Sequence, residues 1–194
     1  MKTLIILGND KIGGTAFKRL YSSQSLSIMI DLSSNLSRIF ELIRKKKIGI
    51  QLLIKMILAE LMRTGSKPPK SLPSISSNAQ LLERIEKERF QKIILFRAGL
   101  IIRKSVIETG VQIFNIHAAK VPEYGGIGSI NCALQDEAFD QFACFHRVTD
   151  KIDDGEVVDR ESFTLSPDKP YYVNEDIAYA AATCLLLRNV EFKN

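Results

Sequence analysis

The chain alternates between short apolar runs and longer stretches whose apolar positions recur every three or four residues. A compact run of β-branched and aliphatic residues bounded by Gly, Asn, Asp or Ser predicts a buried strand, whereas the longer spacing predicts an amphipathic helix. We expect strands at 3–7, 26–30, 92–96, 112–116, 142–149 and 156–163, and helices at 12–20, about 36–62, from 130 onward and 174–188, with a further helix capped by Asn78.

The order of these elements predicts the fold class. Strands alternate with helices over the first two thirds of the chain, as in α/β proteins whose parallel strands are joined by helical crossovers. We therefore expect a single Rossmann-like domain over residues 1–194, with a mostly parallel sheet flanked by helices. The Pro- and Ser-rich stretch 67–77 should be a loop. Because ligands of such sheets bind beyond the carboxyl ends of the strands, functional residues are expected there.

Charge changes the interpretation of one element, the helix at about 36–62. The chain has 27 Lys and Arg against 22 Asp and Glu, a net charge of +5, and much of the excess lies at 44–47 and 63–70. An apolar helix beside basic residues is typical of interfacial membrane helices, so weak contact with a membrane surface is one expectation. The main interpretation is a helix that packs on the sheet with a solvated basic end. Polar residues interrupt the apolar run, so we expect no transmembrane segment.

Composition narrows the class of protein further. The proportions of apolar and charged residues are those of an ordinary globular domain, and the moderate net charge does not indicate a nucleic-acid partner. Cys132, Cys144 and Cys184 lack the paired spacing of a zinc site, so we expect buried thiols and no bound metal. The apolar stretch before Gly8 is too short for a signal peptide, and we expect a cytoplasmic protein.

An amide and an imidazole stand together at the end of the strand expected at 112–116. Alternation along a strand places Asn115 and His117 on the same side. This pair suits a reaction that develops an oxyanion, because the amide donates a hydrogen bond and the imidazole holds or moves a proton. An isolated Asn-x-His is structural at least as often as it is catalytic. The second histidine, His146, lies within an expected strand, where we predict a structural role.

A polar turn at 148–157 carries three carboxylates, Asp150, Asp153 and Asp154, before Gly155. A carboxylate near an imidazole raises the pKa of the imidazole and orients the ring, and it can relay a proton. The alternative is an ordinary Asp-Gly hairpin turn without a catalytic role.

In order and spacing, Asn115-Ile116-His117, Val121-Pro122-Glu123-Tyr124-Gly125-Gly126 and residues 148–157 resemble the folate-dependent formyltransferases, and the resemblance extends from about 93 to 163. This family includes enzymes that act on glycinamide ribonucleotide, on methionyl-tRNA and on amino sugars. The resemblance implies that Asn115 polarises the formyl oxygen and that His117 stabilises the tetrahedral intermediate. It also implies that Asp153, rather than its neighbour Asp154, governs proton transfer.

The resemblance also implies where ligands bind. N10-formyltetrahydrofolate would lie between Ala98-Gly99-Leu100-Ile101 and a second wall containing Thr149, Asp150 and Ile152. Arg97, beside this slot, would either reach the glutamate tail of the folate or be solvated. The amine substrate would contact Gly8, Asn9, Tyr124, Gly125 and Gly126. The glycines after the first strand resemble a phosphate-binding loop, but their spacing fits a tight turn equally well.

The implied reaction is formyl transfer to a primary amine, on a nucleotide-linked amino sugar or a related phosphorylated metabolite. Two alternatives stay open: glycinamide ribonucleotide formylation in purine synthesis, and a noncatalytic module that binds folate or nucleotide. The expected partner is the small-molecule amine, and a second copy of the chain in a homodimer is a further candidate.

Overall fold

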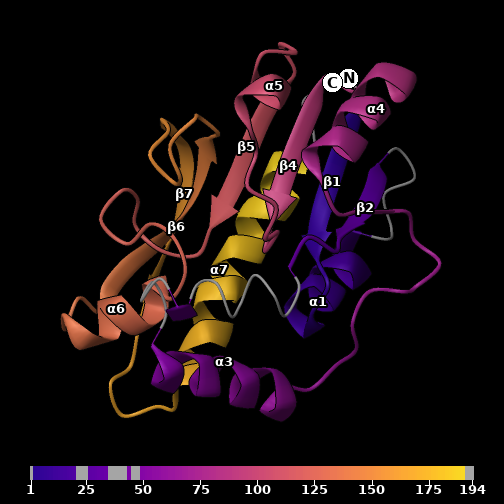
Figure 1. Cartoon of the computed structure of the whole chain (residues 1–194). Helices are drawn as coiled ribbons and strands as arrows, with labels where there is room; N and C mark the ends of the chain where they lie inside the picture. The colour runs from indigo at the N-terminus through magenta and orange to yellow at the C-terminus, as the bar shows by residue number, and fades with distance from the viewer. Residues whose placement is uncertain (1, 21–25, 35–42, 45–48, 191–194) are drawn as a thin grey trace.

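The computed structural model describes residues 2–20, 26–34, 43–44 and 49–190, and within these residues seven strands form one sheet (Figure 1). Five strands are parallel, and the last two run antiparallel to their preceding neighbours. In spatial order the strands are β3 (Ser74–Ile75), β2 (Ser27–Asp31), β1 (Thr3–Gly8), β4 (Lys92–Phe96), β5 (Gln112–His117), β6 (Asp140–Arg147) and β7 (Val157–Thr164).

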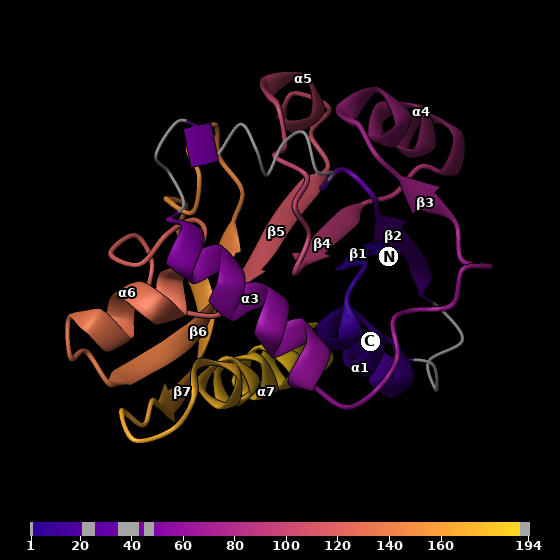
Figure 2. The same ribbon diagram turned by 60° about the horizontal axis from the view of Figure 1, so that its bottom comes forward.

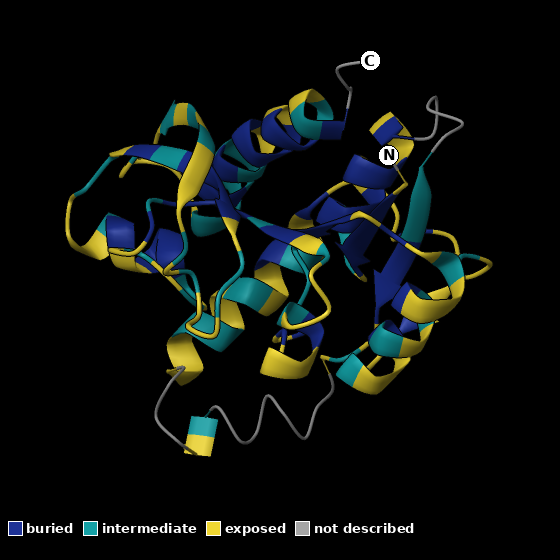
Figure 3. Ribbon diagram, turned by 90° about the horizontal axis from the view of Figure 1, so that it is seen from above, coloured by how far each residue is buried: buried dark blue, intermediate teal, exposed yellow. Residues whose placement is uncertain are grey.

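Helices cover both faces of the sheet, as the sequence predicts for an α/β protein (Figures 1 and 3). Side chains of β1 alternate between the two faces because successive residues of a strand point in opposite directions. Ile5 and Leu7 belong to one buried core, and Leu4 and Ile6 belong to the other. The first core is covered by α1 (Lys11–Leu20), α6 (Ser129–Gln135) and α7 (Tyr171–Val190), and the second by α4 (Asn78–Glu88) and α5 (Lys104–Ile107).

Three local predictions are corrected by the structure. The expected loop at 67–77 contains β3, whose two residues pair with the end of β2. The N-cap of α4 is Ser77, whose hydroxyl accepts a hydrogen bond from the main-chain N–H of Gln80, rather than Asn78. The cysteines are not all core thiols: Cys144 is buried, whereas Cys132 and Cys184 are exposed.

The expected long helix is described as a helix only over α3 (Ile50–Met62) and at 43–44, since residues 35–42 and 45–48 lie outside the described residues. This helix does not pack flat on the sheet. It crosses the open edge beyond the carboxyl ends of the central strands, from α6 toward α1 (Figure 2). Midway along α3, Lys55 Nζ lies 2.8 Å from Asn131 Oδ1 of α6, and at its C-terminal end the carbonyl oxygen of Leu61 lies 3.2 Å from Lys11 Nζ of α1.

In the part of the chain that the structure describes, no helix is both long enough and apolar enough to cross a bilayer.

Truncation of a central strand residue tests the two-sided core. Ile94 of β4 is fully buried, so Ile94→Ala should lower the free energy of unfolding by about 2–5 kcal/mol, through lost burial and the cavity that remains. Ile57→Ala is the matched control, because the Ile57 side chain on α3 is 51% exposed and its loss should change stability by less than about 0.5 kcal/mol. Urea unfolding measures both, and similar losses in the two variants would contradict this arrangement.

Candidate active site

The carboxylate of Asp153 is the meeting point of residues from distant parts of the chain. Its Oδ1 accepts a hydrogen bond of 3.0 Å from Asn115 Nδ2, and its Oδ2 lies 3.3 Å from His117 Nδ1. The main-chain N–H of Gly126 donates to Oδ2 at 2.8 Å, and His146 Nε2 lies 3.3 Å from Oδ1. Asp153 therefore contacts both of the other residues to which the resemblance assigns catalysis, Asn115 and His117, and a second histidine as well.

Strand pairing positions the amide and both imidazoles. Asn115 and His117 lie on the same side of β5, where its last residues reach the carboxyl edge of the sheet. Asn115 is opposite His146 in the antiparallel pair of β5 and β6, and Asn115 Nδ2 lies 3.3 Å from His146 Nε2. Two neighbouring strands therefore supply three of the four polar side chains of the site.

The turn between β6 and β7 directs Asp153 toward these strands. Asp153 has a φ of 49°, in the left-handed region that Asp tolerates better than most residues. Gly155 is required nearby, because a Cβ there would collide with the carbonyl oxygen of Arg147. Asp154 points elsewhere: its carboxylate lies 3.4 Å from Lys151 Nζ, and its side chain is 41% exposed. The geometry therefore distinguishes the two adjacent acids and places only Asp153 against the imidazoles.

His117 contacts hydrogen-bond acceptors through both ring nitrogens. The carbonyl oxygen of Tyr124 lies 2.8 Å from Nε2, and because a carbonyl only accepts, Nε2 carries a proton. Nδ1 faces Oδ2 of Asp153 and is a donor to it only when the ring carries a second proton. The protonation of His117 therefore decides whether it attracts or repels the carboxylate beside it.

Burial and charge set the protonation of this pair. Burial lowers the pKa of His117 below its ordinary value, more than the charge of Asp153 and the carbonyl of Tyr124 raise it. Burial raises the pKa of Asp153, but hydrogen bonding to His146, the charge of His117 and the Gly126 N–H outweigh that effect and hold this pKa well below its usual range. At pH 7 the site therefore contains an ionised Asp153 and a neutral His117.

The predicted substrate loop lies directly against this carboxylate. Besides the carbonyl of Tyr124 and the N–H of Gly126, the loop brings Gly125 so close that a Cβ there would lie 3.2 Å from Asp153 Cβ. Gly126 has a φ of 82°, which favours glycine. The Tyr-Gly-Gly segment therefore supplies main-chain polar atoms to the site and leaves room for Asp153.

The two predicted walls of the folate slot border one apolar cluster. Ala98, Leu100 and Val148, which precedes the second wall, all pack in the core on the α4 side of the sheet. The aliphatic side chains of Ile101 and Ile152 are exposed by 51% and 59%. Thr149 folds back on its own turn, since its hydroxyl accepts a hydrogen bond of 3.3 Å from the N–H of Lys151, and Asp150 is exposed.

The main chain of the first wall is held by side chains that the sequence did not suggest. The N–H groups of Gly99 and Leu100 donate to Oδ2 of Asp31 at 2.5 and 2.9 Å. Asn78 donates to the carbonyl oxygen of Ile101 at 2.9 Å. Asp31 at the end of β2 and Asn78 at the start of α4 therefore fix the path of this segment.

Carboxylates already occupy donors at the N-terminus of α1, where the glycines resembled a phosphate-binding loop. Asp10 accepts a hydrogen bond of 2.8 Å from the N–H of Gly13, and Glu60 of α3 accepts one of 3.0 Å from the N–H of Lys11. Gly8 is buried, and a Cβ there would collide with the carbonyl oxygen of Arg97; Asn9 is exposed. These contacts correspond to a tight turn closed by acidic side chains.

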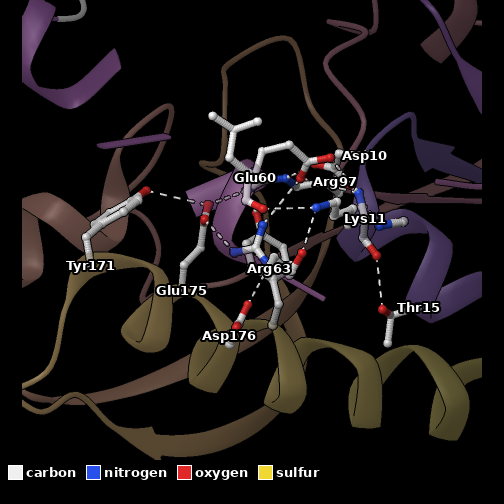
Figure 4. A network of polar contacts seen from close by, with 12 residues as sticks. Asp10, Lys11, Thr15, Glu60, Arg63, Arg97, Tyr171, Glu175 and Asp176 are labelled. Atoms are coloured by element: carbon white, nitrogen blue, oxygen red, sulfur yellow. Dashed lines mark hydrogen bonds and ion pairs between the residues drawn. The ribbon is translucent and has the colours of Figure 1, made fainter. Parts of the chain in front are cut away.

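Arg97 is neither solvated nor directed along the folate slot, which corrects the sequence interpretation (Figure 4). Its guanidinium pairs with Asp10 at 2.6 Å and with Glu175 at 2.8 Å, and it donates to the hydroxyl of Tyr179 at 2.9 Å. The other carboxylate oxygen of Glu175 lies 2.9 Å from Arg63 at the C-terminal end of α3. A chain of ion pairs therefore joins α1, α3, the end of β4 and α7.

Sequence reasoning missed the parts of the site that depend on tertiary contacts. His146 was assigned a structural role from its place within a strand, and its contact with Asp153 depends on a pairing register that no local pattern reveals. Arg63 and Glu175 are both buried and form an ion pair, although 112 residues separate them in the sequence. The one available signal for Arg63 was its place at the end of an apolar helix.

Comparison with known proteins relates this geometry to a family. No protein-family model matches the chain. Methionyl-tRNA formyltransferase of Neisseria meningitidis is 25% identical over 128 residues, which are 64% of this chain and 40% of that protein. This chain therefore spans well under half the length of that relative.

Solved structures of formyltransferases have a similar fold. A phosphoribosylglycinamide formyltransferase from Anaplasma phagocytophilum matches with a TM-score of 0.68 at 12% identity, over 98% of this chain and 84% of that one. An N-formyltransferase from Helicobacter canadensis, solved in complex with folinic acid and dTDP-3-aminofucose, matches with a TM-score of 0.65 at 12% identity, over 98% of this chain and 63% of that one.

These likenesses confirm the α/β fold class, and the fold is that of the folate-dependent formyltransferases. They also confirm the resemblance to this family that the three sequence motifs indicated.

The pKa of His117 provides a test of the site. We expect its imidazole to titrate below about 6.5, the ordinary value, and to titrate lower still in Asp153→Asn, because the variant removes the charge that raises the pKa. Since the unfolded chain binds this proton at higher pH than the folded chain, the contribution of His117 to stability should fall as the pH drops below about 6.5. NMR titration of the imidazole, assigned with His117→Ala, measures the pKa. A midpoint that rises in Asp153→Asn would contradict the assigned contact.

The shared carboxylate of Glu175 should be far more important for stability than an exposed one. Glu175→Gln leaves two arginines short of a partner in a buried network, and we expect it to lower the free energy of unfolding by about 3–5 kcal/mol. The control is Glu161→Gln, which removes the exposed pair with Arg188 and should cost less than about 1 kcal/mol. Denaturant unfolding compares them, and equal small losses would exclude a structural role for the network.

Proposed function

We propose that this chain is a cytosolic enzyme that transfers a formyl group from N10-formyltetrahydrofolate to a primary amine. The observation that carries the proposal is the contact of Asp153 with both Asn115, at 3.0 Å, and His117, at 3.3 Å, at the carboxyl edge of the sheet. The similarity to formyltransferases in fold and in sequence supports it.

In the proposed reaction an unprotonated amine attacks the formyl carbon of the donor. A carbon–nitrogen bond forms to the amine, and the formyl oxygen becomes an oxyanion that Asn115 Nδ2 and His117 Nε2 stabilise by hydrogen bonds. Asp153 accepts or relays the proton that the attacking nitrogen loses. Collapse of the intermediate breaks the bond to N10, which takes up a proton and leaves as tetrahydrofolate.

The groups that donate hydrogen bonds in the site must change their acceptors during this reaction. Asn115 Nδ2 is bonded to Asp153 and contacts His146, and the Nε2 proton of His117 is bonded to the carbonyl of Tyr124. A formyl oxygen can accept these hydrogen bonds only when it replaces a protein acceptor. We therefore infer that binding of N10-formyltetrahydrofolate displaces the Tyr124 carbonyl from His117.

We assign the folate to the slot between Ala98-Gly99-Leu100-Ile101 and the wall of Thr149, Asp150 and Ile152. Exposed aliphatic side chains at Ile101 and Ile152 suit a flat heterocycle, and a few fixed main-chain groups would orient it. The folinic acid bound to the Helicobacter canadensis enzyme supports a reduced folate as the ligand.

We assign the amine to the side of the site formed by Gly8, Asn9 and the Tyr124-Gly125-Gly126 loop, and we propose a nucleotide-linked amino sugar as its class. The dTDP-3-aminofucose in the Helicobacter canadensis complex supports this class. Glycinamide ribonucleotide is the alternative amine, and the likeness to the Anaplasma phagocytophilum enzyme supports it. A noncatalytic folate-binding module is the alternative of a different class, favoured by the protein acceptors that Asn115 Nδ2 and His117 Nε2 already have.

The test is formyl transfer from N10-formyltetrahydrofolate to a panel of amino-sugar nucleotides and glycinamide ribonucleotide. Removal of one oxyanion donor or of the proton acceptor should cost about a hundredfold or more in kcat, so Asn115→Ala, His117→Ala and Asp153→Asn should each be nearly inactive. Asp154→Asn is the matched control and should retain activity, since Asp154 faces Lys151 instead of the site.

Each result has a definite meaning. Turnover that survives in Asp153→Asn but not in Asp154→Asn would show that the wrong acid was chosen. Tight binding of the folate without transfer to any amine in the panel would favour the noncatalytic module.

A further inference from the structure

The outward face of α3 is an apolar stripe. Ile50, Ile54, Ile57, Leu58 and Leu61 recur at helical spacing and are between 50% and 68% exposed, and Met62 continues the stripe at 62%. Ala59, on the opposite side, is the buried residue of the helix. Leu52, Leu53 and Met56 on the inward side are half-buried, so the helix is apolar on both sides and the exposed stripe is apolar surface that the fold itself does not cover.

Polar contacts hold the helix in this orientation. At its C-terminal end Arg63 is buried and pairs with Glu175 at 2.9 Å and with Asp176 at 2.5 Å. Glu60 accepts a hydrogen bond from the main chain of Lys11, and Lys55 donates to Asn131. These contacts fix the helix to the fold, and those of Arg63 and Glu60 can be followed in Figure 4. The aliphatic side chains of the stripe stay exposed.

Positive charge is concentrated in the part of the sequence that contains α3, where Arg63 is paired with the carboxylates of Glu175 and Asp176. Residues 38–70 contain nine Lys and Arg and two Asp and Glu, so this segment has a charge of +7 within a chain whose net charge is +5. Among the described cations, Arg44, Lys55, Lys67 and Lys70 are exposed. An anionic partner is therefore favoured, and a second copy of the same face is disfavoured, because a two-fold interface would bring two such segments together.

The shape and chemistry of the stripe select among anionic partners. It is a single convex helix face of Ile, Leu and Met side chains, without the Trp and Tyr that anchor most protein interfaces. Aliphatic side chains on one face with cations beside them are the features of helices that lie in the interface of anionic bilayers.

We propose that α3 docks this chain on anionic phospholipid surfaces, with Ile50, Ile54, Ile57, Leu58 and Leu61 inserted among the lipids and the neighbouring cations at the headgroups. The proposal does not depend on formyl transfer. It places the carboxyl edge of the sheet, which α3 crosses, toward the membrane (Figure 2).

Vesicle flotation tests the proposal with the whole chain. Vesicles of phosphatidylcholine are compared with vesicles containing about a third phosphatidylglycerol, each at about 0.1 M and about 0.5 M NaCl. We expect binding to the anionic vesicles at low salt, with weaker binding at high salt and on phosphatidylcholine alone. Ile57→Gln/Leu61→Gln should reduce the partition coefficient roughly tenfold or more, because it removes two inserted side chains. Circular dichroism and thermal unfolding confirm that the variant folds.

Val158→Gln is the matched control, because Val158 is an aliphatic side chain 51% exposed on the edge strand β7, and it should bind as the parent does. Absence of parent binding, or equal binding by the parent and the double variant, would overturn the proposal. So would light scattering that shows a dimer of the parent which the double variant loses, since a second copy would then cover the stripe.

Discussion

The site depends on one buried anion, the carboxylate of Asp153. Removing a carboxylate from water is costly unless donors replace the lost hydration; here the Asn115 amide and the Gly126 N–H donate to it, and the two imidazoles lie 3.3 Å away. These groups come from β5, β6 and the loop after β5, so the carboxylate can be buried only when all of these segments are in register. The left-handed backbone of Asp153 is then the local strain that the surrounding contacts sustain.

The carboxylate of Glu175, which two arginines share, is the second anion on which the structure depends. Glu175 of α7 pairs with both Arg97 after β4 and Arg63 at the end of α3, and Asp10 and Asp176 supply the further negative charge, so these ion pairs fix the end of α3 to α7. Ala59, Leu52, Leu53 and Met56 face inward, and the polar contacts at the end of the helix hold it so that its second apolar side stays exposed. The same network closes the N-terminus of α1 with Asp10 and Glu60.

Features that depend on residues close together in the sequence could be predicted, whereas features that depend on contacts between distant residues could not. The run at 92–96 is apolar after Lys92 and identified β4 without error, and strand alternation placed Asn115 and His117 on the same side. In α3 nearly every position is apolar, so periodicity could not show which side is inward; distant ion pairs decide it. The strand β3 consists of two residues that exist as a strand only because β2 lies beside them.

The proton balance of the site limits how the proposed chemistry can proceed. The pKa of His117 and the pKa of Asp153 are both below their ordinary values, so neither group is a strong enough base to remove a proton from a free ammonium ion. The amine must therefore reach the formyl carbon already neutral. Once it has attacked, its N–H bonds become far more acidic, and a weak base in contact is sufficient. An ionised carboxylate beside a neutral imidazole can therefore accept the proton of the intermediate but not that of the free ammonium ion. Interactions that are stronger after the attack than before it are the ones that lower the barrier.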